Sequence, residues 1–205
     1  MAGDPNIQVV LFDLGGVLID VGGVPPMKAL ARIETDEEMW QRWLTCRWVR
    51  SFERGECSPD EFATGVVGDW ALEVEPAVFL QSFREWPGAP LPGAHDLVVD
   101  VRASVPVGCL SNTNAMHTDD HFEKFPIFDL FDYRFLSFQL GLVKPDRALF
   151  ERVAELVPVA PGRVAFLDDN LMNVEGATEA GFVARHVRGV DEARAALVAL
   201  EVVDA

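Results

Sequence analysis

Reactive side chains follow several short apolar runs of this sequence at the point where each run ends. A carboxylate, a hydroxyl with its polar neighbours, an ammonium and a carboxylate pair are delivered in this way. They are Asp13 in "VVLFDLGGVLID", Ser111 with Asn112 and Thr113 in "LSNTN", Lys144 in "GLVKPD", and Asp168 with Asp169 in "FLDDN". Taken singly, each residue has an ordinary explanation as a cap, a turn residue or a solvated charge.

Together these residues indicate a site for a divalent cation. In an open parallel sheet, ligands bind beyond the carboxyl ends of the strands, where the residues after each run are expected to meet. Asp13, Asp168 and Asp169 would repel one another there unless a cation offsets their charge. Carboxylate oxygens suit a hard ion, so we expect Mg²⁺.

Such a site suits phosphoryl transfer. A carboxylate such as Asp13 can attack phosphorus and form an acyl phosphate, while Lys144 and the metal neutralise charge on the phosphoryl oxygens. Ser111 and nearby backbone N–H groups would donate hydrogen bonds to the same oxygens. Gly15 and Gly16 would let the loop backbone approach the phosphate without a Cβ clash.

The pattern around these residues predicts a parallel α/β core. Unalternating apolar runs, typical of strands buried on both faces, occur at Val9–Phe12, Val105–Leu110, Arg163–Leu167 and Phe182–Val187. Amphipathic stretches that predict helices occur at 93–103, 145–156, 171–180 and 191–200, the third with Asn170 as N-cap and Gly181 as its stop. Alternating strands and helices predict a Rossmann-like sheet with helices on both faces, a three-layer core.

Residues 20–90 break this alternation and predict an inserted helical cap. The stretch contains all five tryptophans and reads as helices, for instance over 37–52 and 59–72, with no convincing strand. Tryptophan spacing of this kind favours a packed core over a ligand cage. The turn-rich segments "DVGGVPP" and "WPGAPLPG" mark its ends as hinges, so the core is expected to comprise residues 1–19 and 91–205.

Composition argues against some classes of partner. The 205 residues carry 33 acidic and 17 basic side chains, a formal net charge of −16 that would repel nucleic acids and anionic membranes. The three cysteines lack a metal or disulfide spacing, and Cys109 falls in a predicted strand, where packing is its expected role. "MAGDPNIQ" lacks the features of a leader and no apolar run reaches membrane-spanning length, so we expect a cytoplasmic protein.

The order of the motifs resembles the haloacid dehalogenase-like hydrolase superfamily. "FDLGGVL", "LSNTN", "GLVKPD" and "FLDDNLMNVEGA" stand in that superfamily's sequence, with a helical cap between the first two. More narrowly, "FERGECSPDEF" and "LSNTNAMHT" resemble the branch that contains α-D-glucose-1-phosphate phosphatase. The resemblance implies a phosphatase acting on a small phosphorylated substrate, such as a sugar 1-phosphate, through an aspartyl-phosphate intermediate.

The resemblance also implies a role for each motif residue. It makes Asp13 the nucleophile, with Ser111 and Lys144 holding the phosphate beside Gly15, Gly16 and Asn112. The remaining roles concern the metal, which the resemblance assigns to Asp13, Asp169 and the backbone carbonyl of Gly15, with Asp168 and Asn173 in support.

The sequence departs from the family pattern at one position. Phosphatases of the superfamily usually carry a second Asp two residues after the nucleophile as general acid and base, and here that residue is Gly15. The loss predicts a strong dependence on leaving-group quality, unless His117, a cap residue or an ordered water supplies the proton. Arg54 and Glu56 are further candidates for substrate contact from the cap.

Two other functions remain open at the level of sequence. A metal-independent haloacid dehalogenase also uses an attacking aspartate and lacks the second Asp, although the Asp168–Asp169 pair would serve no purpose there. A phosphate-binding or interaction protein that lost catalysis through Gly15 is the other alternative. The response to Mg²⁺ separates the first from a phosphatase, and turnover separates the second.

Overall fold

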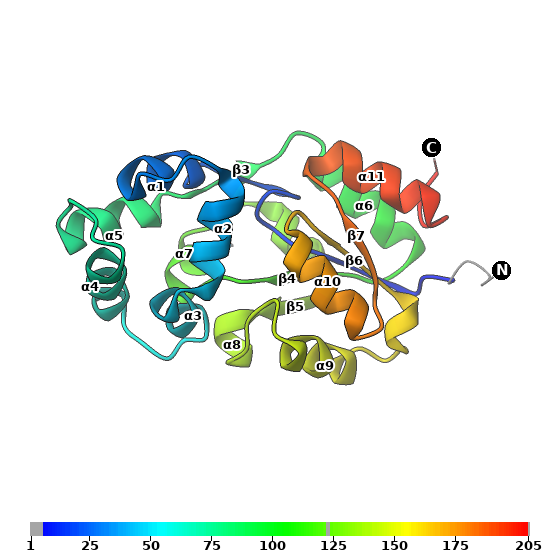
Figure 1. Cartoon of the computed structure of the whole chain (residues 1–205). Helices are drawn as coiled ribbons and strands as arrows, with labels where there is room; N and C mark the ends of the chain where they lie inside the picture. The colour runs from blue at the N-terminus through cyan, green and yellow to red at the C-terminus, as the bar shows by residue number, and fades with distance from the viewer. Residues whose placement is uncertain (1–5, 122–123, 205) are drawn as a thin grey trace.

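The computed structural model describes residues 6–121 and 124–204, which form a parallel sheet with an attached group of helices (Figure 1). Most of the N-terminal segment "MAGDPNIQ" considered above, residues 1–5, lies outside the described residues. The sheet has the order β5-β4-β1-β6-β7, and every neighbouring pair is parallel. Its strands are β5 (Tyr133–Leu136), β4 (Val107–Ser111), β1 (Val9–Phe12), β6 (Val164–Asp168) and β7 (Val183–His186).

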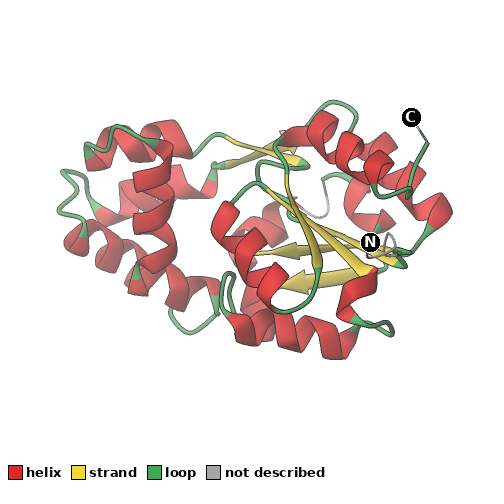
Figure 2. Ribbon diagram, turned by 45° about the vertical axis from the view of Figure 1, so that its right-hand side comes forward, coloured by secondary structure: helices red, strands yellow, loops and turns green. Residues whose placement is uncertain are grey.

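Helices cover both faces of this sheet, as Figure 2 shows, and give the predicted three-layer α/β core. One face packs against α6 (Ala94–Ser104) and α11 (Gly189–Ala199), and the other against α9 (Arg147–Leu156) and α10 (Leu171–Glu179). Alternate residues of β1 serve the two layers: Val10 and Phe12 face the first pair of helices, whereas Val9 and Leu11 face the second. Burial on both faces explains why β1 is continuously apolar.

The predicted core elements agree with the structure to within about two residues. Asn170 caps α10 by accepting a hydrogen bond from the Met172 N–H at 3.0 Å, and Gly181 follows that helix with a φ of +92°. One helix starts later than predicted, because α9 begins at Arg147 rather than at Pro145, whose peptide bond with Lys144 is cis. The edge strand β5 was not predicted.

Short elements join the main ones on the core side. They are α7 (Ala115–His121), α8 (Ser137–Leu140) and the 3₁₀ turns η1 (Pro126–Leu130) and η2 (Pro161–Arg163). In the part of the chain that is described, no helix has the length and apolarity to cross a membrane.

The stretch between β1 and α6 contains five helices with an apolar cluster of their own. They are α1 (Val24–Ala31), α2 (Asp36–Thr45), α3 (Arg47–Glu53), α4 (Pro59–Asp69) and α5 (Pro76–Arg84). Trp43 lies at the centre of the cluster, with its ring centroid 5.1–6.3 Å from those of Phe62, Trp70, Phe83 and Trp86. The tryptophans therefore contribute to packing, as their spacing predicted.

Two expectations for this stretch were wrong. The helix predicted over 37–52 is broken, because Cys46 adopts an extended conformation with a ψ of 121° between α2 and α3. The stretch is also not free of strand. β2 (Ile19–Val21) and β3 (Pro87–Pro90) pair antiparallel where the chain enters and leaves the helices. Their seven residues include two prolines and one glycine, which carry no strand signal.

Candidate active site

Asp13 lies immediately beyond the carboxyl end of the central strand β1. Its backbone N–H continues the pairing with β6 by donating to the Leu167 carbonyl at 2.8 Å, so the main chain is fixed at this point. The Asp13 Oδ1 atom accepts a hydrogen bond from the Leu14 N–H at 2.7 Å. Asp13 is 9% exposed and lies at the edge of the sheet where Ser111 and Asp168 also end their strands.

Lys144 joins two of the predicted carboxylates. The Nζ atom lies 2.9 Å from Asp13 Oδ1 and 2.6 Å from Asp168 Oδ2, and the side chain is 1% exposed. Burial acts to lower the pKa of Lys144, but the carboxylates of Asp13 and Asp168 outweigh it and hold the pKa above its usual range. Lys144 is therefore a permanently charged ammonium next to Asp13.

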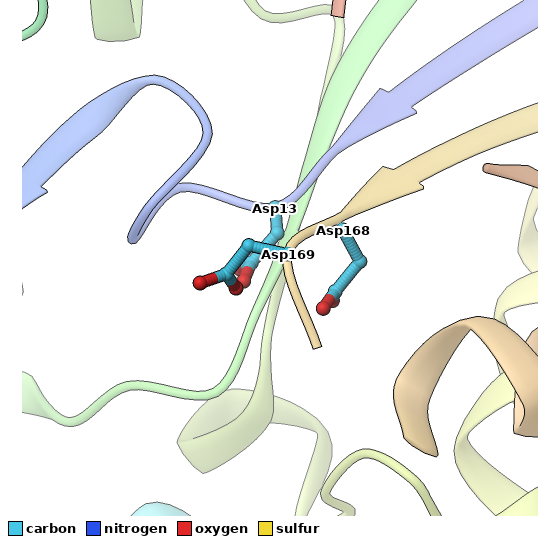
Figure 3. Close-up of side chains that lie close together, drawn as sticks. All are labelled: Asp13, Asp168 and Asp169. Carbon is cyan, nitrogen blue, oxygen red and sulfur yellow. The ribbon is translucent and has the colours of Figure 1, made fainter. Parts of the chain in front are cut away.

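Asp13, Asp168 and Asp169 form a cluster in which one oxygen of each carboxylate lies within 4.8 Å of the others. Figure 3 shows Asp13 and Asp169 directed to the same side, whereas Asp168 turns away from them. Asp168 is held in that direction by Lys144 and by Asn173, whose Nδ2 donates to both carboxylate oxygens at 3.0 Å. Asp13 and Asp169 thus direct their carboxylates to a common space, and Asp168 binds the Lys144 ammonium that contacts Asp13.

The charges of this cluster are not balanced by the protein alone. Burial raises the pKa of Asp13 to about 8, with Lys144 opposing the shift and Asp168 and Asp169 adding to it. Burial and then Asp168 raise the pKa of Asp169 to about 6. Three acids face one ammonium, and carboxylate oxygens are the ligands that Mg²⁺ prefers, so the residues present fit that ion.

Gly16 makes room for this cluster, and Gly15 makes room for the side chain of Val21. Gly16 has a φ of +73°, and a Cβ there would lie 2.3 Å from Asp169 Oδ2. A Cβ on Gly15 would lie 2.9 Å from the Val21 Cγ2 atom. The Gly16 carbonyl accepts a hydrogen bond from the Gly189 N–H at 2.8 Å, which ties the loop to the start of α11.

Ser111 and Asn112 complete the set of predicted site residues at the end of β4. Ser111 is 5% exposed and ends the strand next to β1. The Asn112 side chain binds the backbone of Lys144 twice: its Nδ2 donates to the carbonyl at 3.0 Å, and its Oδ1 accepts from the N–H at 2.8 Å. Asn112 therefore holds the segment that carries Lys144 against the edge of the sheet.

Glu53, the last residue of α3, is a buried acid that the sequence reading missed. It is 8% exposed, and its carboxyl interacts with the side chains of Trp43 and Asn112 and with the charge of Lys144. The signal that could have revealed it is its position, because Glu53 shares the buried face of α3 with Val49 and Phe52. A charged residue on an apolar helix face needs a polar partner.

The other residues singled out in the sequence have local partners. The His117 Nε2 atom lies 2.8 Å from the Phe83 carbonyl, which joins α7 to the end of α5. Arg54 and Glu56 pair with each other at 3.0 Å in the loop after α3. Cys109 is fully buried in β4, and burial raises the pKa of its thiol to about 12, so its expected packing role is confirmed.

Comparison with known proteins agrees with this arrangement. Residues 7–181 match the model of the haloacid dehalogenase-like hydrolase family. The chain therefore belongs to that family, and the resemblance that its motifs carried is confirmed at the level of the superfamily.

Two relatives cover most of the chain. A D-ribitol-5-phosphate phosphatase from Bacteroides thetaiotaomicron is 28% identical over 86% of this chain and 89% of its own length. A sesquiterpene phosphatase from Aspergillus oryzae is also 28% identical, over 89% of this chain and 90% of its own length.

A solved structure gives the same fold. It is a HAD family enzyme from Bacteroides thetaiotaomicron in complex with magnesium and inorganic phosphate. It superposes with a TM-score of 0.69 at 25% identity, covering 89% of this chain and 94% of that one.

Proposed function

We propose that the protein is a Mg²⁺-dependent phosphatase that hydrolyses a small phosphate monoester through an aspartyl-phosphate at Asp13. The observation that carries the proposal is the contact of Lys144 Nζ with Asp13 Oδ1 at 2.9 Å, beside the carboxylate of Asp169. An ammonium next to a nucleophilic carboxylate allows a doubly charged phosphoryl group to approach it. Both relatives described above carry phosphatase names, which supports the same class of reaction.

The metal would be held by Asp13, Asp169 and the backbone carbonyl of Gly15, with Asp168 and Asn173 in support. The excess of carboxylates over cations in the cluster favours this assignment. When bound, Mg²⁺ supplies positive charge that offsets the charge of the phosphoryl oxygens.

The residues of the chain would perform the displacement in turn. One Asp13 oxygen attacks phosphorus, and the bond between phosphorus and the ester oxygen breaks. Lys144 and the Ser111 hydroxyl bind the phosphoryl oxygens and keep them in line during the transfer. Gly16 leaves the space that the Asp169 carboxylate occupies beside Asp13.

The substrate we propose is a sugar phosphate, such as a sugar 1-phosphate. The core motifs would contact only the phosphoryl group of the substrate. The helices between β1 and α6 would therefore select the non-phosphate part of the substrate and exclude water from the site. The two relatives are named for D-ribitol 5-phosphate and for a sesquiterpene, two different non-phosphate groups, which supports a choice of substrate outside the core motifs.

A screen of phosphate monoesters with Mg²⁺ tests the proposal. We expect phosphate release that EDTA abolishes and added Mg²⁺ restores, and we expect Asp13→Asn to remove turnover almost completely. Asp20→Asn is the matched control, because Asp20 is exposed on β2 and is expected to leave the rate unchanged.

Each alternative function predicts a different result in this screen. Release that persists in EDTA would contradict the metal assignment. Halide release from 2-haloacids under the same conditions would indicate a dehalogenase. Phosphate binding without turnover of any ester would indicate a protein that has lost catalysis.

A further inference from the structure

Glu53 is held beside the candidate active site by contacts on both sides of it. One turn before it, Arg50 forms an ion pair with Asp146, two residues after Lys144. Two residues after it, Gly55 has a φ of +71°, and a Cβ there would lie 3.0 Å from the Phe138 carbonyl in α8. The end of α3 is thus fixed against the core, and Glu53 faces the segment that carries Lys144.

Within residues 6–121 and 124–204, Glu53 is the one buried charged side chain that comes from the helices between β1 and α6. Figure 1 shows these helices beyond the carboxyl ends of the sheet strands. A phosphoryl group bound by Asp13 and Lys144 would place its ester oxygen toward them. Glu53 therefore approaches the site from the side on which the leaving group departs.

The reaction needs a proton at that side, and other nearby groups are committed elsewhere. Gly15 carries no side chain where an acid is usual, and a side chain there would collide with Val21. Asp168 already accepts hydrogen bonds from Lys144, Asn173 and the Asn170 N–H. Both ring nitrogens of His117 have partners, the Phe83 carbonyl at 2.8 Å and the Asn114 side chain at 3.2 Å.

We infer that Glu53 is the general acid and base of the reaction, an inference that rests on the proposed phosphatase function. In the first step, Asp13 attacks phosphorus while the departing ester oxygen takes the proton of Glu53, which gives the alcohol, the aspartyl-phosphate and the Glu53 carboxylate. In the second step, a water oxygen attacks phosphorus while Glu53 takes a proton from that water. The bond to Asp13 breaks, and phosphate, the Asp13 carboxylate and protonated Glu53 result.

The electrostatic surroundings of Glu53 agree with this role. Burial raises its pKa to about 7, against the opposing effects of Trp43, Lys144, Arg50 and Asn112. Lys144 and Arg50 are the charged groups among them, and both would stabilise the carboxylate left after proton donation. A pKa near neutrality lets one residue donate and then accept a proton in a single cycle.

The test is the dependence of kcat/KM on leaving-group pKa in the wild type and in Glu53→Gln. We expect Glu53→Gln to lose about 10²- to 10⁴-fold on alkyl phosphates, which need a proton donor, and to lose little on p-nitrophenyl phosphate, which does not. The slope against leaving-group pKa should therefore be steeper in the variant. In the wild type, kcat/KM should change near pH 7 as Glu53 titrates, and this change should be absent from Glu53→Gln. Glu53→Asp should recover part of the rate on alkyl substrates.

Glu37→Gln is the matched control, because Glu37 lies in the same group of helices, in the first turn of α2, and is exposed, so all of these rates should be unchanged. Equal losses of Glu53→Gln on every substrate would show a purely structural role and overturn the inference. An unaltered slope would overturn it too, while wild-type release of nitrophenol with Mg²⁺ keeps the phosphatase function. A wild type without activity on any ester would overturn both.

Discussion

Replacing the buried carboxyl of Glu53 by an amide is expected to change how the stability of the protein depends on pH. Burial raises the pKa of Glu53 from 4.5 to about 7 in the folded state. Between these two values the folded protein binds more protons than the unfolded chain does. The free energy of unfolding of the wild type must therefore fall as the pH rises through this window, and Glu53→Gln removes the contribution.

The size of the effect follows from the two pKa values. They differ by 2.5 units (7 minus 4.5), and each unit corresponds to about 1.36 kcal/mol. The stabilisation is present below about pH 4.5 and lost above about pH 7. Relative to the wild type, Glu53→Gln should therefore gain about 3 kcal/mol of stability between about pH 4 and pH 8.

Urea unfolding at a series of pH values measures this difference. All five tryptophans lie between residues 40 and 86, so fluorescence reports on the helices that contain Glu53, and circular dichroism reports on the whole chain. Glu37→Gln, in the exposed first turn of α2, should follow the wild type at every pH. If the stability difference between wild type and Glu53→Gln is the same at every pH, Glu53 does not hold its proton near neutrality and the reasoning is refuted.

Two further substitutions test the electrostatics and the packing of the site. Gly16→Ala should lose Mg²⁺-dependent activity and about 1–2 kcal/mol of stability, because its Cβ would meet Asp169 and its φ is positive; Gly68→Ala, with open space around the new Cβ, is the control in a Mg²⁺ titration. Lys144→Met should cost about 3–5 kcal/mol in urea unfolding, because it leaves buried carboxylates uncompensated. Added Mg²⁺ should recover part of that loss. A Lys144→Met variant whose stability does not change with Mg²⁺ would contradict the view that a cation compensates these carboxylates.

The sheet and its site were predictable because their signals are local. The continuously apolar run of β1 and the Asp that follows it are adjacent in sequence, and parallel pairing then brings Asp13, Ser111 and Asp168 to one edge. The strand β5 escaped because Tyr133 and Arg134, in its first half, are not buried. β2 and β3 were not predicted because they are strands through their pairing with each other and not through their composition.

The site residue that was missed depends on contacts between distant segments. The importance of Glu53 comes from Asn112 and Lys144, which lie far along the chain. Its place on the apolar face of α3 signals burial, but the sequence does not show which polar groups it meets there. The role expected for the glycines was incomplete for the same reason. That Gly16 adjoins Asp169 follows from the folded loop, which the sequence pattern does not specify.

The pairing of β2 with β3 has a consequence for how this molecule can change over generations. Ile19 pairs with Pro90 and Val21 with Pro87, so the chain leaves and re-enters the core at neighbouring points. The five helices between β2 and β3 thus connect two paired antiparallel strands, as the loop of a β-hairpin does. The entropic cost of such a loop grows only slowly with its length, so mutation can lengthen, shorten or replace it with little disturbance at Asp13. Phosphoryl chemistry and the choice of substrate can then diverge as separate inherited modules.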